Sequence, residues 1–185
     1  MKAAITVLGF AGSLRKHSYN KSILNAAVEL TSKKVELETF DLEGIPPFNQ
    51  DFETEPPARV KEFKARIRAA DALLIATPEY NYSIPGVLKN AIDWASRPYV
   101  DNVFEDKPVA IMSASIGILG GARAQYHLRQ TFVFLNAHPL NRPEVIIPYA
   151  NKRIDENGRL TDETTREKIK ELLEALATWT VRLRK

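Results

Sequence analysis

The chain alternates short apolar runs with longer amphipathic segments along almost its whole length. Five runs have the length and composition of buried strands, and the segments between them carry apolar residues at the spacing of helices. The strands are expected near 4–8, 35–40, 72–76, 109–113 and 143–147, and the helices near 21–31, 56–70, 85–96, 123–136 and from about 162. This alternation predicts an α/β fold, a three-layer sandwich with helices on both faces of a five-stranded parallel sheet.

The composition restricts the chemistry that the chain can perform. A length of 185 residues suits one domain, expected to span residues 1–185, because no repeat or separating linker interrupts it. The absence of cysteine excludes disulfides, thiolate catalysis, cysteine-ligated zinc and iron–sulfur clusters. The 26 basic and 23 acidic residues give a net charge of +3 without a long basic run, which argues against a nucleic-acid partner. No run reaches the roughly 20 apolar residues that span a bilayer, so we expect no membrane partner and a cytoplasmic protein.

The loop after the first expected strand is rich in hydroxyl groups and ends in a helix. Ser13 and Ser18 supply hydroxyls, and Arg15 can bind phosphate oxygens with its forked guanidinium. Asn20 or Ser18 can cap the following helix, whose free N–H groups favour an anion. The loop therefore predicts a phosphate site, although an ordinary strand-to-helix turn with a capped helix has the same pattern.

The loop after the third expected strand is rigid, polar and aromatic. Pro78 and Pro85 limit its freedom, and Tyr80 and Asn81 add a phenol and an amide. This combination suits a planar heterocycle with polar edges. A third loop with glycines, residues 114–121, follows the fourth strand. In a sheet of order 2-1-3-4-5, strands one, three and four are neighbours, so we expect their three loops to form one site.

Catalysis by side chains alone finds little support in the sequence. The first loop has neither the Gly-Lys-Ser/Thr of a triphosphate loop nor the GxGxxG of a dinucleotide loop, and no GxSxG hydrolase elbow occurs. The histidines lack metal-ligand spacing, so no metal is expected. Glu79 and Asp93 can be interpreted as paired carboxylates, but a structural hydrogen bond for Glu79 and a helix face or subunit contact for Asp93 with Asn90 are simpler interpretations. We expect no catalytic side chain and assign the chemistry to a cofactor.

Four segments resemble the NADPH-dependent FMN reductase family, nearest to its bacterial chromate and quinone reductases. They are GSLRKHSYN at 12–20, TPEYNYSIPG at 77–86, LKNAIDW at 88–94 and GGARAQYHLRQ at 120–130. Their common order is specific, and the resemblance extends over nearly the whole chain. It implies a flavodoxin-like fold with the strand order 2-1-3-4-5 and FMN as the bound cofactor.

The same resemblance implies roles for individual residues within these motifs. The residues expected at the FMN phosphate are Ser13, Arg15, Ser18 and Asn20. Those expected along the ring and the ribityl chain are Pro78, Glu79, Tyr80 and Asn81, and those expected on the far side are Ser113, Ser115 and Gly117. Tyr82 and Arg123 are expected beside the substrate pocket.

The resemblance also implies the activity. NAD(P)H would deliver hydride to FMN, and an acceptor would then take the same place: a quinone, free flavin, an azo compound or an oxidised metal ion such as chromate. The alternatives are a flavodoxin-type electron carrier without its own substrate and a flavin-binding regulatory module. Such carriers are usually strongly acidic, which a net charge of +3 does not match.

A homodimer or homotetramer is expected from the resemblance and from the helix near 123–136. This helix has more apolar side chains than one inward face requires; they are Tyr126, Phe132, Val133, Phe134 and Leu135. Residues 45–48 add a second apolar patch, and such patches mark contact surfaces. Burial of the helix between the sheet and the last helix is the alternative interpretation.

Overall fold

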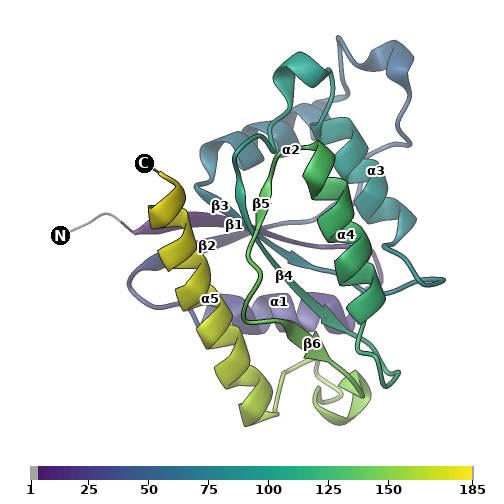
Figure 1. Ribbon diagram of the computed structural model, residues 1–185. Coiled ribbons are helices and arrows are strands. Elements are labelled where there is room, and N and C mark those ends of the chain that lie inside the picture. Colours follow the sequence, from purple (N-terminus) through teal and green to yellow (C-terminus); the bar gives the residue numbers. More distant parts are fainter. Residues whose placement is uncertain (1–3, 185) are drawn as a thin grey trace.

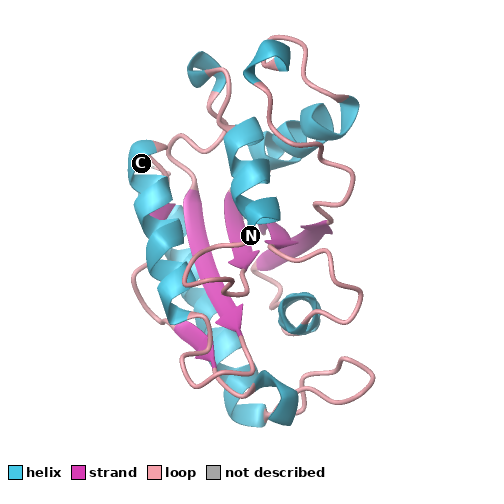
Figure 2. Ribbon diagram, turned by 90° about the vertical axis from the view of Figure 1, so that its right-hand side faces the viewer, coloured by secondary structure: helices cyan, strands magenta, loops and turns pink. Residues whose placement is uncertain are grey.

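The computed structural model describes residues 4–184, which form a parallel sheet with helices on both faces (Figure 1 and Figure 2). The strands are β1 (Ile5–Ala11), β2 (Val35–Phe40), β3 (Ala72–Ala76), β4 (Pro108–Ala114), β5 (His138–Pro139) and β6 (Val145–Ile147). The helices are α1 (Tyr19–Glu29), α2 (Ala58–Ala69), α3 (Gly86–Ala95), α4 (Ala122–Phe134) and α5 (Glu163–Leu183). Short 3₁₀ helices occupy Gln50–Phe52, Tyr99–Asp101 and Ala150–Lys152.

The strand order of the sheet is β2-β1-β3-β4-β5, with β6 also paired to β4. All of these pairs are parallel, so the predicted flavodoxin-like order is confirmed. The composition of each strand explains its place. Central β3 is buried at every position and has no polar residue, whereas β2 alternates between buried and exposed over its first four residues. Such alternation is typical of an edge strand with one solvated face.

The edge beyond β4 differs from the sequence prediction, which placed one continuous strand at 143–147. Two short strands share this edge: β5 pairs with the start of β4, and β6 pairs with its end. Pro139 and Pro143 lie at and between the two strands. Because proline has no N–H to donate, it interrupts a ladder of hydrogen bonds. The sheet therefore has six strands in place of the predicted five.

Two hydrophobic cores lie on opposite faces of the sheet. Helices α1 and α5 cover one face with side chains such as Ile23 and Leu172. Helices α2, α3 and α4 cover the other face with side chains such as Phe63, Ile92 and Phe132. Successive strand residues enter the two cores alternately, as the period of two requires. Figure 1 shows the two sets of helices around the sheet.

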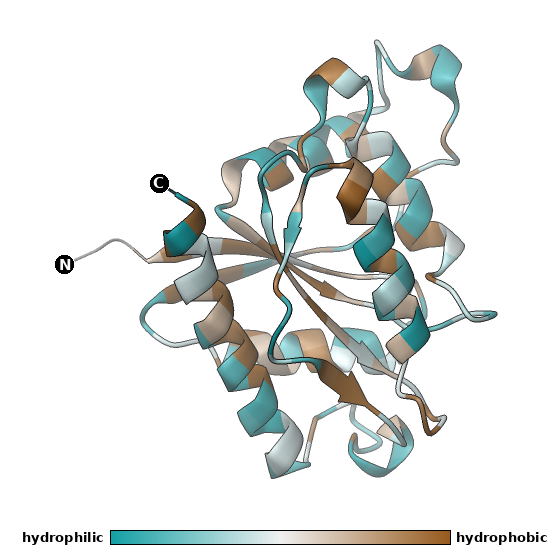
Figure 3. Cartoon of the chain, viewed as in Figure 1, coloured by the Kyte–Doolittle hydropathy of each residue, from teal (hydrophilic) through white to brown (hydrophobic). Residues whose placement is uncertain are grey.

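This arrangement decides how α4 is buried. Leu128 and Phe132 face the sheet, and α5 lies on the opposite face, so the alternative of α4 packed between the sheet and the last helix is wrong. The outward side chains Val133 and Phe134 are 79% and 73% exposed. Figure 3 shows brown apolar positions on this outer helix. Helix α4 therefore has an apolar surface that the monomer leaves uncovered.

The parallel topology brings the segments after β1, β3, β4 and β6 to one edge of the sheet. In Figure 1 this edge lies towards the bottom, where β4 and β6 end. Within residues 4–184, no helix has both the length and the apolar character needed to cross a membrane.

Candidate functional site

Hydrogen bonds between strand ends hold the three predicted loops together. The N–H of Gly12 donates to the carbonyl of Ala76 at 2.8 Å, which joins the first loop to β3. The N–H of Thr77 donates to Met112 O at 2.9 Å, which joins the second loop to β4. The predicted convergence of these loops is therefore present in the fold.

The first loop, residues 12–18, ends in a capped helix. The Ser18 hydroxyl accepts hydrogen bonds from the N–H groups of Asn20 and Lys21 at 3.2 and 3.4 Å. The Ser13 hydroxyl accepts one from the N–H of Arg15 at 3.3 Å. Ser18 thus fills the capping role that the sequence left open between it and Asn20.

Positive charge and free donors collect in the first loop. No acidic residue lies in the first turn of α1, although such residues are favoured there. The Arg15 guanidinium lies 5.1 Å from the Tyr19 ring and has no carboxylate partner among residues 4–184. The N–H groups of Leu14, Lys16 and His17 also lack an acceptor in this described part of the chain. The loop therefore fits an anion such as a phosphate.

Asn20 is placed differently from the other predicted phosphate residues. Its buried amide donates to Ala114 O at 2.9 Å, and its carbonyl accepts from the Ala114 N–H at 3.0 Å. These bonds fasten the start of α1 to the end of β4 and direct the side chain at the strand. A contact between Asn20 and a phosphate stays a prediction.

The second loop, residues 77–83, folds into a tight turn. The N–H groups of Tyr80 and Ser83 donate to each other's carbonyls, both at 3.0 Å. Between them, Asn81 and Tyr82 have φ values of 49° and 68°. Two successive left-handed residues define a type I′ turn, and a tyrosine there is strained. The turn presents the half-exposed ring of Tyr80 and the more exposed ring of Tyr82.

Glu79 anchors this turn to α4. Its carboxylate, whose side chain is only 7% exposed, accepts from the N–H groups of Arg123 and Ala124 at 3.0 and 3.3 Å, and it pairs with the Arg123 guanidinium. Hydrogen bonding to Glu79 raises the pKa of Arg123. The guanidinium also lies 3.5 Å from the centre of the Tyr82 ring. Because the carboxylate faces α4, the backbone of Glu79 is the part available to border a ligand.

The third loop follows β4. The buried Ser113 hydroxyl donates to Gly120 O at 2.7 Å and accepts from the Gln125 amide at 2.8 Å. Gly121 has a φ of 91°, and a Cβ added there would lie 2.7 Å from the Ser113 Cβ, so only glycine fits. Ser113 therefore shapes the loop internally, whereas Ser115 and Gly117 lie on its more open part.

Known proteins match this chain and this arrangement. Residues 5–152 match the family model for NADPH-dependent FMN reductases. An NAD(P)H-dependent FMN reductase of Pseudomonas aeruginosa is 54% identical over 185 residues, which is 100% of each chain. An NADPH:quinone oxidoreductase of Arabidopsis thaliana is 44% identical, covering 99% of this chain and 95% of the relative. The protein belongs to the NADPH-dependent FMN reductase family.

A solved structure agrees with this assignment. The flavoenzyme NAD(P)H:(acceptor) oxidoreductase FerB from Paracoccus denitrificans has a TM-score of 0.88 at 34% identity, covering 97% of this chain and 98% of its own. The predicted enzyme class, its FMN cofactor and its dependence on NAD(P)H are confirmed by family membership. The alternative of an electron carrier without its own substrate is thereby disfavoured.

Some residues that shape the three loops escaped the sequence prediction. Gln125 was only part of a quoted motif, yet its buried amide holds Ser113 and also donates to Val145 O at 2.9 Å. The Nδ1 of His127 lies 3.0 Å from the Ser83 hydroxyl, so this side chain supports the second loop. No local signal distinguishes either residue, because both partners lie far away along the chain.

The remaining polar candidates, Asp93 and Asn90, have structural partners. Asp93 pairs with Lys89 at 2.7 Å on the surface of α3. Asn90 donates to Pro46 O at 2.8 Å and accepts from the Phe48 N–H at 2.7 Å, which holds the segment 45–48 against α3. Among residues 4–184, no group of three His, Asp or Glu side chains is arranged to hold a metal.

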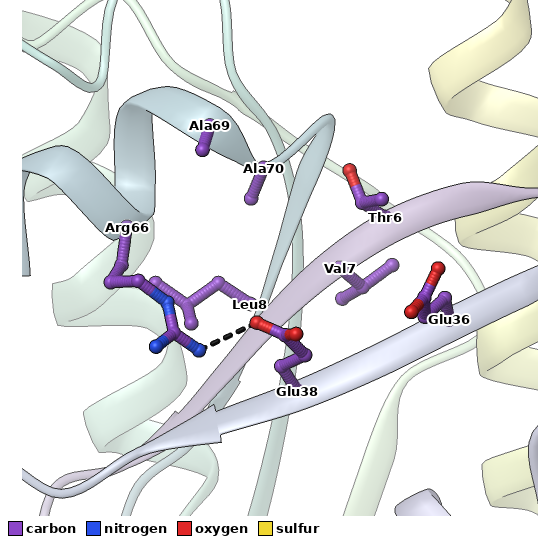
Figure 4. Close-up of a pocket in the computed structure, with 8 residues that line it drawn as sticks. All are labelled: Thr6, Val7, Leu8, Glu36, Glu38, Arg66, Ala69 and Ala70. Carbon is purple, nitrogen blue, oxygen red and sulfur yellow. Dashed lines mark hydrogen bonds and ion pairs between the residues drawn. The ribbon is translucent and has the colours of Figure 1, made fainter.

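A small hollow lies elsewhere in the reductase fold. It has a volume of about 120 Å³ and lies between α2 and the strands β1 and β2 (Figure 4). The ion pair of Arg66 and Glu38 lies beside it. None of its lining residues belongs to the three loops, so it lies outside the expected flavin site.

Proposed function

We propose that this FMN reductase uses quinones as its principal electron acceptors, with free flavin, azo compounds and oxidised metal ions such as chromate as further ones. The turn at 80–83 carries this proposal. It is rigid, presents exposed aromatic rings, and stands beside the loops that form the expected flavin site. A rigid aromatic border suits a flat, largely apolar acceptor such as a quinone. A relative named 2-hydroxy-1,4-benzoquinone reductase, from a Burkholderia species, is 41% identical to the chain and supports the same class.

The first loop fits the phosphate end of FMN. Within residues 4–184, Arg15 has no carboxylate partner, and backbone donors without acceptors surround it before the start of α1. Ser13 and Ser18 would add their hydroxyl groups, while Asn20 would hold the loop in place. The residues present therefore fit a dianionic phosphate.

The second and third loops fit the flavin ring. Pro78, Tyr80 and Asn81 would border it with the backbone of Glu79, and Ser115 and Gly117 would lie on the far side. When bound, FMN supplies the hydride chemistry that links NAD(P)H to the acceptor. The protein would contribute position and electrostatics, without a catalytic acid or base.

Tyr82 and Arg123 would form one side of the acceptor pocket. The guanidinium lies against the Tyr82 ring while Glu79 neutralises its charge. The contact with Arg123 restrains the Tyr82 ring, and the pairing with Glu79 avoids an unpaired charge beside an apolar acceptor. The three residues would act as a preorganised unit.

We also propose a homodimer, which can pair further into a homotetramer, working in the cytoplasm. On the outer side of α4, Phe134 stacks edge-on with Tyr99 at 5.6 Å between ring centres. Tyr126, Val100 and Val133 are also at least half exposed in this part of the chain. A two-fold contact would bury these side chains. Sedimentation at micromolar protein tests this: a fully active monomer would contradict it.

The function itself is tested with an acceptor panel. Purified protein loaded with FMN would be assayed with NADH and NADPH against benzoquinones, free FMN, an azo dye and chromate. We expect the highest kcat/KM for a quinone, and we expect Tyr82→Ala to lower that value more than the value for chromate. A lower kcat/KM for every quinone than for free FMN would contradict the proposal. Recovery of FAD in place of FMN by mass would contradict the phosphate assignment.

A further inference from the structure

A strained tyrosine lies next to the proposed flavin site. Tyr149 follows β6 and has φ 51° and ψ 45°, in the left-handed region. A bulky residue is unfavourable there, because its Cβ crowds the following carbonyl oxygen. Such outliers persist where the surrounding structure fixes them, and they concentrate at functional sites.

The third loop holds this tyrosine in place. The N–H of Ser115 donates to Ile147 O at 3.1 Å, and the N–H of Ala150 donates to Ser115 O at 3.0 Å. Gly120 packs so closely that a Cβ there would lie 2.8 Å from the nitrogen of Pro148. Tyr149 is thus fixed between residues that bond to Ser115, itself an expected flavin contact. The residue remains 40% exposed.

A cation without an acidic partner accompanies the ring. The Lys152 ammonium lies 5.5 Å from the centre of the Tyr149 ring, and no carboxylate of residues 4–184 pairs with it. Two other cations of this edge are neutralised: Arg123 by Glu79 and Arg153 by Asp162. The Lys152 ammonium is therefore available to pair with a ligand.

We propose that Tyr149 and Lys152 form a subsite for the adenosine 2′-phosphate end of NADPH. The ring would stack on the adenine, and the ammonium would bind the 2′-phosphate that NADH lacks. A neutral quinone has no negative charge for the ammonium to pair with, and the FMN phosphate is assigned to Arg15 in the first loop. The subsite rests on the proposed function, because it presupposes NAD(P)H oxidation at the flavin site.

The first test compares two lysine variants. Lys152→Gln should raise KM for NADPH, relative to KM for NADH, by roughly 3- to 20-fold, between the effects of an exposed ion pair and of a charge-assisted hydrogen bond. It should weaken inhibition by 2′-AMP more than inhibition by 5′-AMP. Lys33→Gln, an exposed lysine in the turn before β2, is the matched control and should leave both ratios unchanged.

The second test uses the strain at Tyr149. Tyr149→Gly should raise the midpoint of thermal unfolding or leave it unchanged, because glycine accepts the left-handed conformation, yet it should raise KM for both nucleotides. Tyr149→Asn repeats the test, because asparagine also tolerates this conformation. Tyr149→Phe should retain tight binding of both nucleotides.

An unchanged ratio of KM for NADPH to KM for NADH in Lys152→Gln would overturn the subsite. Failure of the parent protein to oxidise either nucleotide would overturn the proposed function instead.

Discussion

The loops at residues 12–18 and 77–83 follow neighbouring strands and meet at one edge of the sheet, but they use their polar groups in opposite ways. The first loop leaves the Arg15 guanidinium and several N–H groups without partners in the described chain. In the second loop, Glu79 bonds to α4, and Tyr80 and Ser83 bond to each other. A ligand can supply the partners that the first loop lacks, whereas these polar groups of the second loop already have partners within the protein.

This difference separates two kinds of recognition. Unpaired donors at a helix start bind an anion through charge and hydrogen bonds. A turn that is internally bonded and strained at Tyr82 offers a fixed shape. We infer that the first loop determines which flavin binds and that the second determines what can approach it. The following predictions test this division.

The largest expected effect is on stability, in Asn20→Ala. The substitution leaves the buried N–H and carbonyl of Ala114 without partners. Unsatisfied buried groups cost about 1–3 kcal/mol each, so the loss of both partners should lower the free energy of unfolding by about 2–6 kcal/mol. Denaturant unfolding of the flavin-free protein measures this directly.

The same variant separates a positioning role from a phosphate contact. If Asn20 only positions the loop, affinity for FMN and for riboflavin should fall by similar factors. A small loss of stability with a selective loss of FMN would instead place Asn20 at the phosphate, as the sequence prediction has it.

Arg15→Ala should show the opposite pattern. A charge-assisted hydrogen bond to phosphate contributes about 1.5–3 kcal/mol, so FMN affinity should fall roughly ten- to a hundred-fold. Riboflavin, which lacks the phosphate, should bind almost as before, and stability should change little because the side chain is exposed. Fluorescence titration of the apoprotein with both flavins measures the two affinities. Equal losses of affinity for FMN and riboflavin would refute recognition of the phosphate charge by the first loop.

Glu79→Ala probes the rigid loop. It removes the acceptor for the N–H groups of Arg123 and Ala124. The lost hydrogen bonds correspond to about 1–3 kcal/mol, or roughly 2–12 °C in Tm for a chain of this size. Because the turn loses its anchor, kcat/KM for a quinone should fall roughly ten-fold, while the preference for FMN over riboflavin persists.

Glu62→Ala is the matched control for this variant. Glu62 makes an exposed ion pair with Arg59 on α2, far from both loops in the sequence, and such pairs contribute little. We expect no kinetic effect. If Glu79→Ala behaved like Glu62→Ala, the second loop would not need its anchor, and the contrast between the loops would fail.

The sequence predicted the fold and the convergence of the three loops well, because those features depend on local patterns. Apolar runs and helical spacing locate β3 and α4 to within a few residues, and the parallel order then brings the loops together. The divided edge strand was missed, although Pro139 and Pro143 carried a signal for it.

Side-chain partners were harder to predict, because they join residues that are distant in the sequence. Asn20 and Ala114 are 94 positions apart, and Glu79 and Arg123 are 44 apart. The family resemblance made Asn20 an expected phosphate ligand, but only the packed fold shows that β4 already uses its amide. The left-handed backbone of Tyr149 likewise follows from its contacts with the third loop. Which residues touch FMN stays a prediction until the complex is measured.

The smallest expected effect comes from Asp162, which caps a helix as Glu79 does but belongs to neither loop. Its carboxylate accepts from the Thr165 N–H at 3.1 Å and pairs with Arg153. Hydrogen bonding to the Thr165 hydroxyl, with Arg153 and the Thr165 N–H, holds the pKa of Asp162 below its usual 3.8. As pH falls, the unfolded state therefore binds the proton before the folded state does. The stabilisation from Asp162 is complete above the usual pKa, and it is lost as pH falls through the lower pKa of the folded state.

Asp162→Ala should lower stability by about 1 kcal/mol at pH 7, with a smaller difference near pH 3. Thermal unfolding at both pH values checks this, and flavin titration should show unchanged FMN affinity. A kinetic defect as large as that of Glu79→Ala would mean that any lost helix cap disturbs the site, and the special role of the second loop would then be refuted.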